Sequence, residues 1–377
     1  MTLLYTEVEE ELRASVRDLL ADRCGSDAVL RRVESASPYD MDLWKTLSRE
    51  IGVAGLLVPE EYGGAGASAR EVAVVLEELG RAVAPVPFLT SSVLATKALL
   101  EIGEEDLVQE LASGETTAAL VVSLAASPYK PLPETVTLTE TGEAGRWALN
   151  GQIRAVAGAD VADVLLVPVG TGLFRVDPAD ARIEVVPSLD LTRPVATVTF
   201  SDTPGEVIGS LDIRKVLVFG AGLLASEQLG VAEWCLDTTL AYIKERHQFA
   251  RPVGSFQAIK HRMADLWLDV VRARAAARNA ADLLAAVPHA VTDATGVTDA
   301  AAVEAGEPAA AVAKSWCSEV ALRVAEEAVQ LHGGIGMTWE HPVHLYLKRA
   351  KSTEIALGTP GAHRDALAVL ADLPAPA

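Results

Sequence analysis

The order in which hydrophobic periodicity changes along the chain restricts the fold more than any other feature. Apolar residues recur at helical spacing from residue 7 to about residue 114. Short β-branched runs bounded by Gly, Pro and Asp occupy residues 116–213, and helical spacing returns from Arg214. Helical, then β, then helical is an uncommon order for a chain of 377 residues.

We therefore expect a mainly α protein with a central β domain. The predicted regions are an N-terminal helical domain (1–115), a small β-barrel or sandwich (116–213) and a C-terminal four-helix bundle (214–377). The clearest predicted strands are 119–123, 135–139, 164–169 and 195–200, and the long predicted helices are 216–246, 257–286 and 309–333. Residues 287–308 are rich in Ala, Gly, Thr and Asp and are predicted to form a loop between two bundle helices.

Charge and cysteine content exclude several classes of function. The chain has 32 basic and 52 acidic residues, giving a formal net charge of −20, which disfavours nucleic acid and anionic membranes as partners. The three cysteines have no C-x-x-C spacing, so we expect neither a disulfide framework nor a metal site. The glutamate-rich N-terminus does not resemble a secretory signal, and we expect a cytoplasmic protein.

Two sequence segments carry the strongest functional signal. Residues 242–257 read Y-I-K-E-R-H-Q-F-A-R-P-V-G-S-F-Q, and residues 330–340 read Q-L-H-G-G-I-G-M-T-W-E. Together they resemble the "R-x-x-F-G-x-x-I-x-x-F-Q" and "Q-x-x-G-G-x-G" signatures of the acyl-CoA dehydrogenase family, in the same order. Residues 59–66 are similar to the family's "P-E-E-Y-G-G-x-G". The resemblance implies an N-terminal helical domain, a central β domain and a C-terminal four-helix bundle.

The resemblance also implies a cofactor and a reaction. Family members bind FAD between subunits and oxidise an acyl-CoA thioester to the 2,3-enoyl thioester, with a carboxylate removing the α-proton while the β-hydrogen leaves as hydride. By this resemblance, the residues that reach the FAD of a neighbouring subunit are Arg246, Phe249, Gln257, Gln330, Gly333 and Gly334. An arginine fork suits a pyrophosphate. Taken alone, Arg246 would be a solvated helix-end residue, and Gly333 with Gly334 a helix C-cap.

The position of the catalytic base departs from the family pattern. Most members read "Y-E-G-T" where this chain has Leu357, and leucine cannot accept a proton. Other members carry the base on an earlier bundle helix, at a position that falls near Gly220 here. The nearest carboxylates, Glu227 and Glu354, lie about one or two helical turns away, and one turn is about 5 Å. We expect both to be solvated or ion-paired surface residues.

The β domain departs in a second way. Most members carry "T-E-P-x-A-G-S-D" and "W-I-T-N" stretches, whose side chains hold the flavin ring. Residues 121–128 read V-V-S-L-A-A-S-P, and residues 153–158 read I-R-A-V-A-G. The side chains expected to bind the flavin ring are therefore mostly absent, while those offered to a neighbour's cofactor are retained.

Three hypotheses follow. The favoured one is a base-lacking subunit of a heterotetrameric acyl-CoA dehydrogenase, similar to those that shorten sterol side chains in actinobacteria, with a paralogous subunit as partner and a shared FAD. The first alternative is an autonomous flavoenzyme with altered chemistry or a relocated base, such as Glu354. The second is a non-enzymatic scaffold that keeps only the fold. The sequence does not identify the acyl group.

Overall fold

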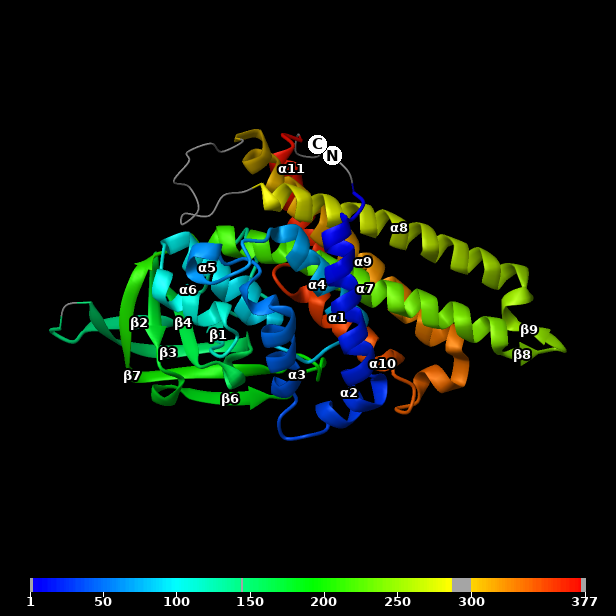
Figure 1. Cartoon of the computed structure of the whole chain (residues 1–377), viewed down its shortest axis with the longest axis horizontal. Helices are drawn as coiled ribbons and strands as arrows, with labels where there is room; N and C mark the ends of the chain where they lie inside the picture. The colour runs from blue at the N-terminus through cyan, green and yellow to red at the C-terminus, as the bar shows by residue number, and fades with distance from the viewer. Residues whose placement is uncertain (1–2, 144, 287–299, 374–377) are drawn as a thin grey trace.

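The computed structural model describes residues 3–143, 145–286 and 300–373, with only the backbone at 300–304. The prediction of a mainly helical protein with a central β domain is confirmed (Figure 1). The sheet lies at one side of the molecule and the long helices extend away from it. The N-terminal helices pack beside the junction of sheet and bundle.

Six α-helices of 6 to 17 residues form the described part of the N-terminal region. They are α1 (Glu7–Arg23), α2 (Ser26–Val33), α3 (Met41–Thr46), α4 (Ala69–Arg81), α5 (Thr96–Ile102) and α6 (Glu105–Ala112), with a π-helical segment η4 (Phe88–Ala95) before α5. Thr6 and Glu9 form a capping box at the start of α1, and Ser68 and Glu71 form another at α4. Such boxes satisfy backbone N–H groups that a helix start leaves unpaired.

The β region is one mixed, seven-stranded sheet in the order β1-β4-β5-β7-β3-β2, with β6 paired to β7. The strands are β1 (Ala118–Leu120), β2 (Val136–Glu140), β3 (Arg146–Ala157), β4 (Val164–Val169), β5 (Gly172–Val176), β6 (Arg182–Val186) and β7 (Val195–Ser210). Alternate side chains of these strands meet in a separate apolar core that includes Leu149, Val198 and Phe200. The long β7 holds the sheet together because it pairs with β3, β5 and β6.

The C-terminal region consists of α7 (Ile213–Glu245), α8 (Gln257–Ala285), α9 (Ala300–His332), α10 (Val343–Ile355) and α11 (Pro360–Leu370). The prediction of a loop over residues 287–308 is wrong in its last part, because α9 begins at Ala300. That part is rich in alanine, the strongest helix former. Residues 287–299 lie outside the described residues. Among the described helices, α7 alone is long and apolar enough to cross a bilayer, and its apolar stretch is entirely buried in the fold.

Two glycines allow α4 and α7 to approach closely. A Cβ placed on Gly230 of α7 would lie 1.9 Å from the carbonyl oxygen of Glu77. A Cβ placed on Gly80 of α4 would lie 2.1 Å from the carbonyl oxygen of Glu227. Backbone atoms cannot move aside as a flexible side chain can, so these contacts fix the N-terminal helices against the bundle.

We predict that Gly230→Ala lowers the free energy of unfolding by about 3 kcal/mol or more, at the upper end of the cost of overpacking. Chemical denaturation measures the change. Gly25→Ala is the control, because no atom lies within 4 Å of a Cβ placed there. Equal losses in both variants would contradict the close packing of α4 and α7.

Candidate functional site

The two base positions, Leu357 and Gly220, lie next to each other. Leu357 follows α10, is fully buried, and has φ of +53°. A Cβ placed on Gly220 of α7 would lie 3.2 Å from Leu357 Cδ1 and 2.4 Å from Leu94 Cδ2. Leu94 comes from η4 and is also buried. The space that a catalytic carboxylate would need from either position is therefore filled with hydrocarbon.

Main-chain hydrogen bonds join this place to the β domain. The N–H of Leu357 donates to the carbonyl of Leu124, and the N–H of Leu124 donates to the carbonyl of Ala155, both at 2.8 Å. Ala155 has φ of +57° and lies in a β-bulge between β3 and β7. The three segments that depart from the family pattern are thus neighbours in space.

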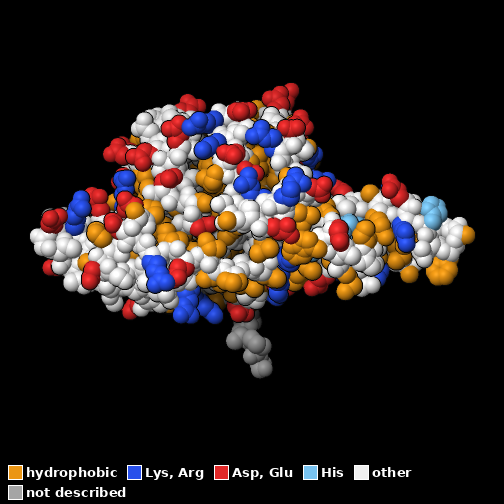
Figure 2. Space-filling view, turned by 90° about the horizontal axis from the view of Figure 1, so that it is seen from below, with side chains coloured by type: hydrophobic (Ala, Val, Ile, Leu, Met, Phe, Trp, Pro, Cys, Tyr) orange, Lys and Arg blue, Asp and Glu red, His pale blue; other side chains and the backbone are white. Residues whose placement is uncertain are grey.

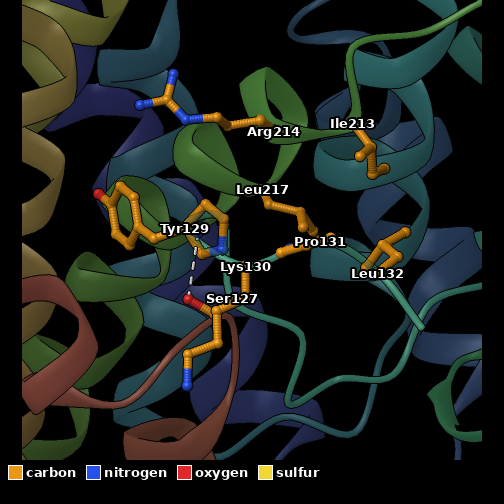
Figure 3. Close-up of a pocket in the computed structure, with 9 residues that line it drawn as sticks. Ser127, Tyr129, Lys130, Pro131, Leu132, Ile213, Arg214 and Leu217 are labelled. Atoms are coloured by element: carbon orange, nitrogen blue, oxygen red, sulfur yellow. Dashed lines mark hydrogen bonds between the residues drawn. The ribbon is translucent and has the colours of Figure 1, made fainter. Parts of the chain in front are cut away.

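A pocket of about 300 Å³ opens beside these segments (Figure 3). One wall is the stretch from Ser127 to Leu132, and the other is the first turns of α7 with Ile213, Arg214 and Leu217. The backbone N–H of Tyr129 donates to Ser127 Oγ at 3.3 Å. Ser127 Oγ lies 3.3 Å from a Cβ placed on Gly358, so the pocket is adjacent to the turn that carries Leu357.

A second pocket, of about 520 Å³, lies on the β domain at the bulge. Its lining includes Gln152, Arg154 and Ala155 of β3, residues 184–186 of β6 and Thr197 of β7. The Arg154 guanidinium donates to Gln152 Oε1 at 3.1 Å. The pocket offers a cation and an amide beside Ala155, which stands where the family's "W-I-T-N" has threonine.

The predicted cofactor-facing residues gather at one end of the bundle, which we call the bundle end (right side of Figure 1). Arg246 ends α7, Phe249 lies in the hairpin of β8 (His247–Gln248) and β9 (Arg251–Pro252), Gln257 starts α8, Gln330 lies in the last turn of α9, and Gly333 with Gly334 begins η8 (Gly333–Met337). All six are exposed to solvent. The rings of Tyr242 and His332 stack with centroids 4.6 Å apart and join the ends of α7 and α9.

The hairpin holds Phe249 outward at an energetic cost. Phe249 is 87% exposed, and both Phe249 and Ala250 have positive φ, at +52° and +63°. Two successive non-glycine residues in the left-handed region of backbone conformation are strained, and such strain concentrates at functional sites. Figure 2 shows apolar side chains exposed at this end, where Met337 and Ile335 also reach the surface. No atom lies within 4 Å of a Cβ placed on Gly333 or Gly334, so the backbone there is open to approach.

A buried cluster of charges joins α7, α10 and the loop before β7. The Arg349 guanidinium of α10 lies 2.7 Å from the carboxylate of Asp190 and 3.0 Å from that of Glu227. It also donates to Thr192 Oγ1 at 2.6 and 3.0 Å. Arg193 pairs with the second oxygen of Glu227 at 2.5 Å. All five side chains are buried.

The prediction that Glu227 is a surface residue is wrong, because this side chain is only 1% exposed. Burial by itself raises the pKa of Glu227, but Arg193 and Arg349 outweigh burial and hold the pKa below its usual value. A carboxylate fixed between two guanidinium groups is a poor base. Glu354, at the end of α10, is partly buried and forms an ion pair with Lys351.

Two features of this region were not predicted from the sequence. Leu94 lies in an apolar run that predicts burial, but nothing in its spacing points to Gly220 or Leu357. The charges of the buried cluster come from three separate segments, and only the fold brings them together.

Comparison with known proteins agrees with the resemblance seen in the sequence. The family model described as "Acyl-CoA dehydrogenase, N-terminal domain" matches residues 6–115, and the one described as "Acyl-CoA dehydrogenase, C-terminal domain" matches residues 209–369. The chain is 37% identical over 355 residues to the acyl-CoA dehydrogenase IpdE2 of Mycolicibacterium smegmatis, covering 94% of this chain and 96% of that protein. The chain belongs to the acyl-CoA dehydrogenase family.

Solved structures agree on the fold. A chain of the ChsE4-ChsE5 complex from Mycobacterium tuberculosis matches with a TM-score of 0.85 and 29% identity. The match covers 100% of the present chain and 100% of that one. An acyl-CoA dehydrogenase from Bacillus anthracis complexed with FAD matches with a TM-score of 0.87, covering 99% of this chain and 70% of that one. At 20% identity, this second likeness shows the fold alone.

We predict that Glu227→Gln lowers the free energy of unfolding by about 3 to 5 kcal/mol, the usual cost of leaving a buried charge without its partner. Glu319→Gln is the control, because Glu319 pairs with Arg364 where both side chains are about half exposed. We expect the control to lose less than about 1 kcal/mol in the same denaturation experiment. A small loss for Glu227→Gln would show that the cluster is not a structural requirement.

The bundle end should lose stability in mild acid. Burial lowers the pKa of His332, whose Nδ1–H donates to the carbonyl of Ala328 at 2.7 Å while the buried Nε2 has no partner in the described structure. The unfolded chain then binds the proton more readily, so this stabilisation is complete above pH of about 6.5 and is lost as pH falls through the folded pKa.

We predict that His332→Phe reduces the fall in the free energy of unfolding between pH 6.5 and 5, measured by denaturation at each pH. His261→Gln, on an exposed position of α8, should leave the slope unchanged. An identical dependence of the free energy of unfolding on pH in the wild type and in His332→Phe would show that His332 does not cause the loss of stability.

Proposed function

We propose that this chain is the subunit of an FAD-dependent acyl-CoA dehydrogenase that completes the FAD site of a second subunit and provides no catalytic base itself. The observation that most strongly supports this proposal is that the position of the catalytic base is filled. Leu357, Gly220 and Leu94 leave no carboxylate and no space for one. Glu227, the buried carboxylate seven residues after Gly220 on α7, pairs with two arginines.

The bundle end supports the donor role. The FAD of a neighbouring subunit would meet a cation at Arg246, an outward aromatic ring at Phe249 and an open backbone at Gly333 and Gly334. FAD, when bound, supplies the hydride acceptor of the family's reaction. We assign to Arg246 the neutralisation of the pyrophosphate and to Gln257 and Gln330 polar contacts with the ADP portion.

The chain's own β domain fits a flavin ring poorly. Val121 and Ala155 offer no side-chain hydrogen bond where the family pattern has threonine. Through the main chain, Leu124 donates to Ala155 and accepts from Leu357. The retained half of the site is thus the half that faces another subunit.

The relatives support the assembly and the substrate class. The Tcur3481-Tcur3483 steroid acyl-CoA dehydrogenase, 31% identical to this chain with a TM-score of 0.81, supports the substrate class. ChsE4 and ChsE5 form a complex of two different chains, and the present chain is similar to that structure over its full length. We propose a paralogous acyl-CoA dehydrogenase as partner, a cytoplasmic heterotetramer as the assembly, and a steroid-derived CoA thioester as substrate.

The test uses the assembly purified with that paralogue. Replacing the partner's catalytic glutamate by glutamine should abolish turnover, since loss of a general base typically costs about 10²- to 10⁴-fold and this chain has no substitute. Glu354→Gln in this chain should leave turnover unchanged. Loss of turnover in Glu354→Gln alone would instead support the autonomous enzyme with a relocated base.

We predict that Arg246→Ala weakens FAD binding by the assembly about 10- to 100-fold, as expected for the loss of a charge-assisted hydrogen bond of about 1.5–3 kcal/mol. Lys244→Ala is the matched control, because it removes the same charge from an exposed position two residues earlier. FAD titration followed by flavin fluorescence measures both variants. Equal affinities would favour the scaffold hypothesis.

A further inference from the structure

α8 lies at the outer edge of the bundle, and one of its faces is open to solvent in the part of the chain that the structure describes (Figure 1). Leu266, Val270 and Ala273 face the bundle and are buried. Because an α-helix turns once every 3.6 residues, the opposite face is centred on Leu268, which is 43% exposed. Four apolar residues lie along this face, three of them exposed and one half-buried. We call them the α8 seam: Ala264, Leu268, Val271 and Ala275.

The α8 seam has the spacing of a coiled-coil contact. Its members follow one another by four, three and four residues, which is the repeat that aligns side chains between two packed helices. A helix that packs on one side only carries polar residues along its opposite face. The alanines at the two ends of the seam leave room for the backbone of a second helix to approach. The outward face of α8 therefore suits a second helix better than it suits water.

Charged residues beside the α8 seam indicate which helix that is. Asp265 and Arg272 lie on the same side of the seam, seven residues apart, and both are exposed. When two copies of α8 pack antiparallel, Leu268 of each copy meets Val271 of the other. The same register places Asp265 of each copy opposite Arg272 of the other, so one contact forms two ion pairs. The face is thus complementary to itself, as a two-fold contact between identical chains requires.

Both charges are available for such a contact. Arg272 lies 3.7 Å from Asp269, which binds Arg323 more closely, at 2.7 Å. Within the described residues, Asp265 has no ion-pair partner. An exposed arginine with a distant partner can turn toward a second carboxylate without breaking a close ion pair.

The other side of the seam and the start of the helix agree with antiparallel packing. Trp267 lies on that side and is 55% exposed. The register places its ring opposite Arg274 of the second copy, and an arginine over a tryptophan ring is a favourable contact. Antiparallel packing also keeps apart the basic first turns of the two copies, with Lys260 and Arg262, which parallel packing would bring together.

We propose that the α8 seam is the contact through which two copies of this chain pair, with their α8 helices antiparallel about a two-fold axis. The occupant of the open face is therefore a second copy of this chain. This inference goes beyond the proposed function, because the pairing needs no second kind of subunit. In the proposed heterotetramer, the α8 seam is the contact between the two copies of this chain.

Sedimentation velocity of the purified chain alone tests the pairing. We expect the wild type to sediment as a dimer. Leu268→Lys should sediment as a monomer, because it places two like charges at the centre of an apolar contact. Val185→Lys is the matched control and should remain a dimer, since it makes the same kind of change at an exposed position of β6. A monomeric wild type, or a dimer that Leu268→Lys leaves intact, would overturn the proposal.

Charge reversal tests the register and the identity of the partner. Asp265→Arg alone and Arg272→Asp alone should each weaken pairing about tenfold or more, because each creates two contacts between like charges. An equimolar mixture of the two variants should restore pairing, since one copy then offers two arginines and the other two aspartates. A mixture that pairs no more tightly than either variant alone would overturn the antiparallel contact.

The pairing and the proposed function fail separately. Sedimentation of this chain alone reports the contact at the α8 seam, whereas flavin content and turnover of the assembly with the paralogue report the proposed function. Asp265, Leu268 and Arg272 are all exposed, so the variants keep the buried face of α8. Circular dichroism checks that each variant is folded.

Discussion

The buried guanidinium of Arg349 is the interaction on which the arrangement of the site depends. It binds Asp190 and Thr192 before β7 and Glu227 on α7, so it fixes α10 against the sheet and the bundle at once. A buried charge must keep its partners, and these partners therefore define one position of α10. Leu357 lies two residues after the end of α10. The side chain that occupies the base position is therefore held in place by this cluster.

A consequence is a filled base position, at which the described residues place no proton acceptor. The same fold that brings positions 220 and 357 together fills the space between them with Leu94. The bundle end, by contrast, is open, strained at Phe249 and Ala250, and rich in groups that suit an anionic cofactor. One molecule thus combines a filled base position with an exposed bundle end. The proposed division of labour between two different subunits would account for both.

Elements with strong local patterns were predictable from the sequence. The predicted strand 164–169 and the helix from residue 257 agree with β4 and α8, because their apolar spacing is decided within a few residues. The strand predicted over 195–200 is the start of β7, which continues to Ser210 through Pro204 and Gly205. Both residues usually interrupt strands, and only pairing with β3 keeps them in this one.

The candidate site was predictable only in part. Sequence motifs pointed to residues 246–257 and 330–334, and gap-free counting pointed to positions 220 and 357. The burial of Glu227 depends on Arg193 and Arg349, which lie far away in sequence, so no local pattern could reveal it.

The flavin content of the purified protein tests the central claim most directly. The visible absorption spectrum is recorded for this chain alone and for its assembly with the paralogous acyl-CoA dehydrogenase, and flavin is counted per chain. We expect a colourless chain alone and an assembly with less than one flavin per chain. A yellow protein with one FAD per chain in the absence of the partner would contradict the account.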